Sequence, residues 1–220
     1  MSSLAGQIEN EATRLGFLLT EEQRDRLQAF FLLLGHWGQR IRLTGSRDPK
    51  ELILRHLGDA LALEKSLVEI ERQRGQALGP CLDVGSGGGL PAFPLLALNP
   101  TRRLCLIEAR RRKAAFLRTA SFELGFSAQV YDDRLEALLE GDKLPLPFDA
   151  TWSLATFSPG EWLHRAVPLT GPGGYVFAFV TEEKLKAPLP PPLVFHGKRT
   201  WERGDGSRRW LVSYEYRQML

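Results

Sequence analysis

The chain has 220 residues, enough for one domain of ordinary to large size with a small appendage. Its 43% hydrophobic and 25% charged residues are typical of a soluble globular protein, and no apolar run approaches the ~20 residues that span a bilayer. The first residues lack the basic and apolar regions of a secretory signal, so we expect a cytoplasmic protein. The net charge of +3 permits nucleic-acid binding without requiring it. We expect no disulfide and no metal site, because both cysteines fall in predicted core strands.

The first part of the chain, residues 4–75, is predicted to be helical. Thr20 before two glutamates is typical of a helix N-cap, and apolar side chains then recur at helical spacing. Residues 41–49 interrupt this pattern, after which a new helix begins. We expect residues 1–75 to form a helical extension packed on a main domain, residues 76–220.

Two polar residues stand out in this later helix. His56 and Asp59 lie about one helical turn apart, so they project from the same face. At this spacing such a pair forms a structural hydrogen bond or ion pair more often than a catalytic dyad. On geometry alone the pair is therefore interpreted as structural.

A glycine-rich turn is the most informative stretch. Residues 81–84 are predicted to form a buried strand that ends in a tight turn and opens a helix. Glycines at alternating positions allow positive φ and let a ligand approach the main chain. The Gly-x-Gly-x-Gly spacing suits S-adenosylmethionine (SAM) better than a dinucleotide, whose pyrophosphate needs the helix N-terminus. We predict cofactor binding at Asp83, Gly85 and Gly87, with a purely connecting loop as the alternative.

A second acid ends the next predicted strand, residues 103–108. Glu108 stands where nucleotide-binding α/β folds place a carboxylate that accepts hydrogen bonds from ribose hydroxyls. Strands alternate with helices from residue 81 to about 180, which predicts a Rossmann-like α/β fold with a mainly parallel sheet and helices on both faces. Residues 193–196 and 209–216 are expected to add an antiparallel hairpin.

A basic cluster follows Glu108, at or near the N-terminus of a predicted helix. Cations there oppose the helix dipole at a cost of roughly a few tenths of a kcal/mol per charge, which suggests a compensating anion. Phosphate is the obvious candidate, and a solvated charge run is the alternative. With arginines from the N-terminal region, the cluster would form a basic rim round the cofactor pocket. The candidate phosphate contacts are Arg42, Arg47, Arg110, Arg111, Arg112 and Lys113.

Several segments occur together in a characteristic order from about residue 20 to 155. They are Leu43-Thr44, Arg47-Asp48-Pro49, the Arg-His-x-x-Asp element at residues 55–59, the glycine turn at 82–91, Glu108, residues 113–118 and residues 134–136. This combination resembles the bacterial 16S ribosomal RNA guanine-N7 methyltransferases, also called glucose-inhibited division protein B or RsmG. The Arg-His-x-x-Asp element is the most specific part, since generic SAM enzymes lack it.

The resemblance implies a class I SAM-dependent methyltransferase, a monomer that modifies N7 of a guanine in the 16S rRNA of the small ribosomal subunit without membrane contact. Guanine N7 already carries a lone pair, so the transfer needs no general base and rests on orientation and desolvation. The residues that the resemblance places at the site are Gly85 and Leu90 at SAM, Glu108 at the ribose, Leu135 and Glu136 at the adenine, and His56 and Asp59 beside the substrate opening.

Three positions depart from the family pattern. Leu154 stands where the family has an arginine, Arg42 where it has an asparagine, and residues 179–181 lack an expected lysine. The lost arginine and lysine remove charge-assisted contacts of about 1.5–3 kcal/mol each. Two alternatives therefore stay open: a divergent methyltransferase with another RNA or small-molecule acceptor, and a catalytically silent RNA- or nucleotide-binding protein. An NAD-dependent oxidoreductase ranks last, because the turn spacing is wrong.

Overall fold

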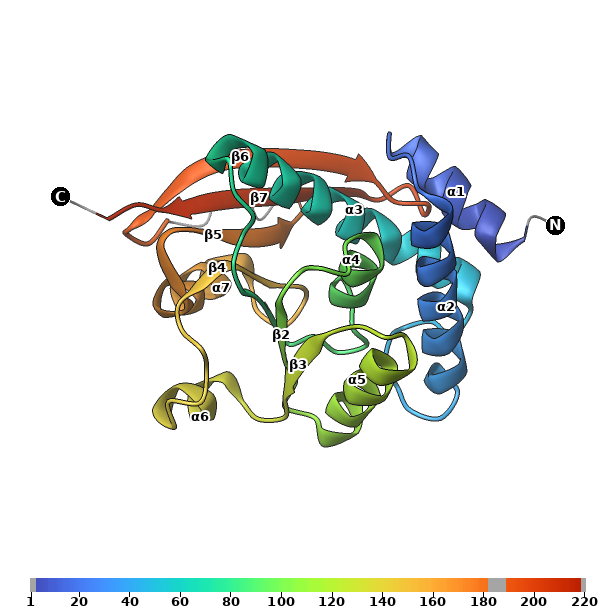
Figure 1. The fold of residues 1–220 in the computed structure, drawn as a ribbon, viewed down its shortest axis with the longest axis horizontal. Coiled ribbons are helices and arrows are strands. Elements are labelled where there is room, and N and C mark those ends of the chain that lie inside the picture. Colours follow the sequence, from blue (N-terminus) through green and yellow to red (C-terminus); the bar gives the residue numbers. More distant parts are fainter. Residues whose placement is uncertain (1–2, 182–188, 219–220) are drawn as a thin grey trace.

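The computed structural model describes residues 3–181 and 189–218 (Figure 1). Three helices come first, and strands then alternate with helices. The helices are α1 (Leu4–Arg14), α2 (Glu21–Gly38), α3 (Pro49–Arg74), α4 (Ala92–Leu98), α5 (Arg111–Glu123), α6 (Leu135–Glu140) and α7 (Pro159–Ala166), with a short 3-10 helix at Val167–Leu169. The strands are β1 (Cys81–Val84), β2 (Leu104–Ile107), β3 (Ala128–Tyr131), β4 (Phe148–Ser153), β5 (Thr170–Val180), β6 (Leu193–Glu202) and β7 (Arg208–Tyr216). No helix within the described residues is long and apolar enough to cross a bilayer.

The first helices begin and end at the residues that their caps favour. Thr20 starts α2 with a capping box, in which its hydroxyl accepts from the Gln23 N–H and the Gln23 side chain accepts from the Thr20 N–H. Asp48 caps α3, whose first residue is a proline, and Gly75 ends that helix in the left-handed region. The predicted helices and the break between them are therefore confirmed.

The seven strands form one mixed sheet in the order β3-β2-β1-β4-β5-β7-β6. The first five pair in parallel, and β7 runs antiparallel to both β5 and β6. The carboxyl ends of the parallel strands therefore meet at one edge, and the chain reverses its direction of winding between β1 and β4. Open α/β sheets bind their ligands at such a reversal.

The C-terminal hairpin is longer than its sequence pattern predicted. The apolar residues 193–196 indicated a short strand, whereas β6 continues to Glu202 and pairs with β7 over nearly its whole length. Because β6 is the edge strand, many of its side chains face solvent, and its second half carries polar residues. Its pairing is set by main-chain hydrogen bonds, which an apolar pattern does not reveal.

Each face of the sheet has its own hydrophobic core. Side chains alternate along a strand, so Cys81 of β1 joins one core while its neighbour Leu82 joins the other. The first core includes buried side chains from all five helices α1–α5, and the second includes α6 and α7. Figure 1 shows these two groups of helices on either side of the sheet, so the predicted layers are confirmed. The division at residues 75 and 76 stays a prediction.

A buried ion network joins α3 to the sheet. Arg102, just before β2, makes two hydrogen bonds to Glu64 (2.7 and 3.0 Å) and also binds Glu71 at 2.9 Å. Burial alone would lower the pKa of Arg102, but the hydrogen bonds and charges of the two glutamates outweigh it and raise that pKa above its ordinary value. Since the Arg102 and Glu64 side chains are almost inaccessible, removal of either partner would leave a buried charge without its counterion.

Candidate active site

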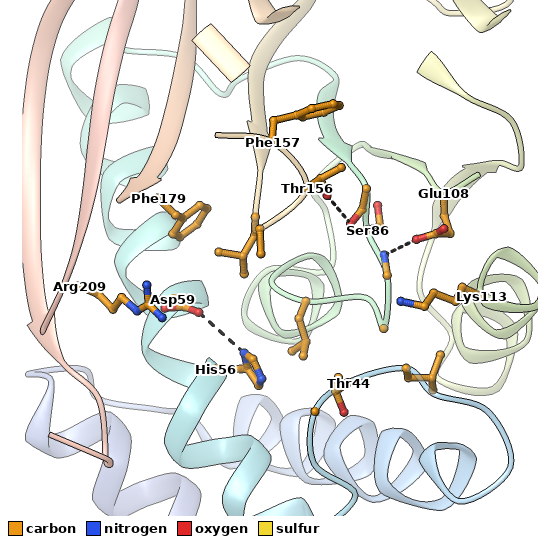
Figure 2. Close-up of a pocket in the computed structure, with 18 of the residues that line it drawn as sticks. Thr44, His56, Asp59, Ser86, Glu108, Lys113, Thr156, Phe157, Phe179 and Arg209 are labelled. Carbon is orange, nitrogen blue, oxygen red and sulfur yellow. Dashed lines mark hydrogen bonds and ion pairs between the residues drawn. The ribbon is translucent and has the colours of Figure 1, made fainter. Parts of the chain in front are cut away.

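A cavity of about 810 Å³ opens at the carboxyl edge of the parallel strands (Figure 2). Its lining comes from the turns after β1, β2, β4 and β5, from the loop before α3, and from α3 and the β6–β7 hairpin. We call the turn after β1 together with Glu108 and Lys113 the glycine-turn side, and His56, Asp59, Arg203 and Arg209 the α3 side. Figure 2 shows Glu108 and Lys113 across the cavity from Asp59 and Arg209.

The glycine turn takes a conformation that other residues rarely adopt. Gly85 has a φ of 79°, and a Cβ added there would overlap the Thr156 side chain. Gly89 has a φ of 77°, and a Cβ there would overlap the ring of Phe93. The turn is fastened to the sheet, since the N–H groups of Gly85 and Ser86 both donate to the Ile107 carbonyl. Its main chain therefore forms a fixed wall of the cavity, in which the spaces beside Gly85 and Gly89 are filled by Thr156 and Phe93.

Glu108 is held by the main chain at the end of β2. One carboxylate oxygen accepts from the Gly87 N–H at 2.9 Å and the other from the Arg110 N–H at 2.8 Å. The side chain lines the cavity although the residue is only 7% exposed. Each oxygen keeps a further lone pair, so the carboxylate can also accept hydrogen bonds from vicinal hydroxyls of a ligand. This geometry suits the ribose role predicted for Glu108.

Asp83 lies behind the glycine turn and does not line the cavity. Both of its carboxylate oxygens are buried, and the nearby Ser86 hydroxyl and Trp152 ring N–H offset only part of the cost of burying a charge there. Burial raises the pKa of Asp83 to about 8, and the negative charge of Glu108 adds to this increase. Its backbone carbonyl accepts from the Ser86 hydroxyl at 3.0 Å, which braces the turn. Asp83 therefore supports the turn from below, and its predicted contact with a cofactor stays a prediction.

On the α3 side, His56 and Asp59 project together as the spacing predicted. They are only loosely paired, with 3.9 Å between His56 Nδ1 and Asp59 Oδ2. The principal partner of the buried Asp59 is Arg203, whose Nη2 donates to Oδ2 at 2.5 Å. His56 Nδ1, Asp59 Oδ1 and Arg203 Nε are all buried without a hydrogen-bond partner. This wall is thus polar and incompletely satisfied.

Sequence reasoning missed Arg203 and Arg209. Both flank the predicted turn at residues 204–206, and two arginines around a glycine turn were the only local signal. Burial lowers the pKa of the Arg209 guanidinium, and the charge of Arg203 lowers it further. Only the sheet topology, which places β7 beside β5, brings these residues to the cavity. Other lining residues absent from the predicted set are Thr44, Ser86, Leu154, Thr156, Phe157 and Phe179.

Two predicted adenine contacts lie away from the cavity lining. Leu135 is buried in the core formed with α6 and α7. Glu136 forms an ion pair with Arg165, and a backbone hydrogen bond together with that arginine lowers the pKa of Glu136. Their assignment to the adenine stays a prediction.

The basic residues divide into two groups. Arg110 and Lys113 line the cavity, with Lys113 beside the glycine turn. The remaining candidates are exposed and do not line it; they are Arg42, Arg47, Arg111 and Arg112. Arg110 is the N-cap residue of α5 and makes no side-chain capping bond. The first turn that follows carries three basic residues and no acid, so this end of the helix is strongly cationic.

The fold is that of the class I methyltransferases. The chain is similar to an O-methyltransferase from Bacillus cereus solved in complex with SAH, with a TM-score of 0.62 and 14% identity, covering 97% of this chain and 100% of that one. It is also similar to the O-methyltransferase TomG from Streptomyces achromogenes solved in complex with SAM, with a TM-score of 0.55 and 18% identity, covering 98% of this chain and 100% of that one. At these identities the likeness concerns the fold alone.

Sequence comparison identifies the family. Residues 23–187 match the GidB family, described as rRNA small subunit methyltransferase G. The chain is 34% identical over 167 residues to the ribosomal RNA small subunit methyltransferase G of Burkholderia lata, covering 76% of this chain and 71% of that protein. It is 35% identical over 164 residues to that of Leptothrix cholodnii, covering 74% and 72%. The chain therefore belongs to the rRNA small subunit methyltransferase G family. The family match ends before β6, so the β6–β7 hairpin lies outside it.

Proposed function

We propose that this protein transfers the methyl group of SAM to N7 of a guanine in the 16S rRNA of the small ribosomal subunit. Family membership is the observation that carries the proposal. The cavity is compatible with it, because a fixed glycine turn and a carboxylate face a separate polar wall across a volume of about 810 Å³. A cofactor and an acceptor base can therefore occupy opposite sides of one cavity.

The glycine-turn side fits SAM by the chemistry of its donor and acceptor groups. Gly87 leaves the main chain open to close approach, and Glu108 offers lone pairs to ribose hydroxyls. Leu90 adds an apolar contact to the cavity lining. When bound, SAM supplies an electrophilic methyl group on its sulfonium.

The acceptor needs orientation more than it needs a base. Guanine N7 carries a free lone pair, so a favourable position supplies most of the advantage through effective molarity. Phe157 and Phe179 line the cavity, and aromatic rings are the usual platforms for an unstacked base. Exclusion of water by Phe157 and Phe179 would remove the hydration shell that otherwise stabilises the positively charged sulfonium of SAM before the methyl group is transferred.

Contact with RNA is supported by exposed arginines, of which Arg110 lines the cavity. Within the described residues, the salt bridges formed by arginines do not include Arg42, Arg47, Arg110, Arg111 or Arg112. Their charges are therefore available to phosphates, as expected for a protein that approaches a folded RNA through its backbone.

The test is methyl transfer from labelled SAM to small ribosomal subunits that lack the modification, followed by mapping of the modified atom. A methyl group on guanine N7 of 16S rRNA is the expected result. Binding of SAM without any transfer to the subunits would overturn the proposal.

One observation favours a second candidate, a methyltransferase with a different acceptor. Leu154 lines the cavity where the family pattern has an arginine, and Thr181 lines it beside the place of the expected lysine. Incubation of the same labelled SAM with total cellular RNA and with small-molecule extracts separates the candidates. Label in a species other than 16S rRNA would favour this one.

A further inference from the structure

The α3 side presents a hydrogen-bond pattern that methyl transfer alone does not require. Asp59 and Arg203 both line the cavity, and their side chains are only 1% and 10% exposed. They place a carboxylate, which only accepts hydrogen bonds, directly beside a guanidinium, which only donates them. The wall therefore offers an acceptor and a donor side by side.

The structure delivers Arg203 to this wall by anchoring the hairpin turn on α3. The Gly204 N–H donates to the Leu54 carbonyl at 3.1 Å, and a Cβ at Gly204 would lie 2.7 Å from Leu54. Within the turn, the Arg203 N–H donates to the Ser207 carbonyl at 2.9 Å. The base of the Arg203 side chain is thus fixed from two directions before any ligand binds.

Both members of the pair keep an unused polar atom. Asp59 Oδ1 and Arg203 Nε are buried and have no hydrogen-bond partner among the described residues. Buried polar groups are almost always paired, so these atoms indicate a partner that is supplied from the cavity.

We propose that Asp59 and Arg203 read the Watson–Crick edge of the acceptor guanine. This inference rests on the proposed function. Guanine presents N1–H and N2–H donors, which Asp59 would accept, next to the O6 acceptor, to which Arg203 would donate. Adenine presents the reverse order, an N6 donor beside an N1 acceptor, and would meet two unsatisfied contacts. N7 lies across the purine from N1 and N2, so a base bound in this way directs N7 toward the glycine-turn side.

Binding of short RNAs to the SAH-loaded full-length protein tests the inference without any methyl transfer. The probes are oligocytidines with one central purine, measured by fluorescence anisotropy at a salt concentration that suppresses phosphate contacts; cytosine, like adenine, presents a donor beside an acceptor in the reverse order. Guanosine and 7-deazaguanosine, which lacks N7 but keeps the same edge, are expected to bind equally, and adenosine roughly tenfold more weakly. Equal affinity for guanosine and adenosine would overturn the inference.

Variants of Asp59 and Arg203 test whether these two residues cause the preference for guanosine over adenosine. Asp59→Asn preserves the shape of the side chain but replaces one acceptor by a donor, and Arg203→Met keeps the stem without the donors. Each is expected to reduce the preference for guanosine over adenosine to within about twofold. The matched control is Glu69→Gln, also on α3, whose carboxylate pairs with Arg199 of β6 outside this cavity. The preference should be unchanged in the control.

The outcomes separate this inference from the proposed function. Methylation of small subunits together with equal binding of both purines would overturn the inference alone. A clear guanosine preference that disappears in Arg203→Met supports the inference even if no subunit is methylated. If Asp59→Asn does not fold, as judged by thermal unfolding, the Arg203→Met and Arg203→Lys variants decide, and an undiminished preference in Arg203→Met would contradict the proposal.

Discussion

The two sides of the cavity are built on different physical bases. The glycine-turn side is made from main-chain groups and one carboxylate, and both oxygens of Glu108 are already engaged by backbone N–H groups. The α3 side is made from side chains that distant segments bring together, and several of their polar atoms lack partners. The first side is complete before a ligand arrives, whereas the second leaves hydrogen bonds for a ligand to make.

The strongest way to break this comparison is to fill the glycine turn. Gly85→Ala adds a Cβ that overlaps Thr156, at a φ of 79° that L-residues avoid. We expect a loss of roughly 3–5 kcal/mol in the free energy of unfolding, from strain and overpacking together. SAM binding, measured by calorimetry, should become undetectable because the turn must shift away from the cavity.

A matched glycine separates backbone strain from the overlap. Gly125 has a φ of 65°, but a Cβ there meets no heavy atom within 4 Å. Gly125→Ala should therefore cost about 1 kcal/mol of stability and leave the SAM affinity unchanged. If both variants behaved alike, the close approach at Gly85 would not be what shapes the site.

The buried ion network of Arg102 with Glu64 and Glu71 gives the next largest expected loss of stability. Arg102 connects Glu64 of α3 to the segment before β2, so it holds the helix that carries His56 and Asp59 against the sheet. Glu64→Gln removes the buried counterion while Glu71 remains, and we expect a loss of about 3 kcal/mol in urea unfolding. Glu21→Gln, which breaks an exposed 3.7 Å pair with Arg24, should cause no measurable change. A loss no greater than that of the control would show that the network is dispensable.

Removal of one charge from the glycine-turn side tests the predicted ribose contact. Glu108→Gln keeps the size of the side chain but loses the ionised acceptor. We expect SAM to bind roughly thirtyfold more weakly, which corresponds to about 2 kcal/mol for a charged hydrogen bond. The guanosine preference of the α3 side should persist in this variant. Unchanged SAM affinity would exclude Glu108 from the cofactor contact.

The same contrast explains what the sequence could predict. Gly85, Gly87 and Glu108 all line the cavity, and the sequence could group them because their positions follow from local conformation and from the ends of two strands; their contacts with a cofactor stay a prediction. Arg203 was not predicted, because it reaches Asp59 only through the pairing of β6 with β7 and the contact of their turn with α3. Local sequence patterns predict sites that are built from the main chain. They do not predict which side chains from distant segments will come into contact.

The hairpin shows the same limit within secondary structure. The apolar residues 193–196 and 209–216 predicted both strands, and glycines marked the turn. The polar half of β6 was missed because an edge strand has little apolar pattern to read. His56 and Asp59 were correctly placed on one face, yet their spacing alone suggested each other as the main partner, and Arg203 holds that place instead.

The carboxyl group under the glycine turn makes the stability of the protein depend on pH. Burial raises the pKa of Asp83 to about 8, above the ordinary value of 3.8 that it takes on unfolding. Between these values the folded protein holds a proton that the unfolded chain releases, so stability falls as pH rises from 4 to 8. Asp83→Asn is neutral throughout, so its stability relative to the wild type should rise from pH 4 to 8 in urea unfolding, by up to about 1.4 kcal/mol for each pH unit between the two pKa values. Asp205→Asn should show almost no trend across this range, because hydrogen bonds from Ser207 lower the pKa of Asp205 below its ordinary value of 3.8, so this group is ionised in both states above pH 4. A constant difference between Asp83→Asn and the wild type from pH 4 to 8 would mean that Asp83 is ionised in the folded protein.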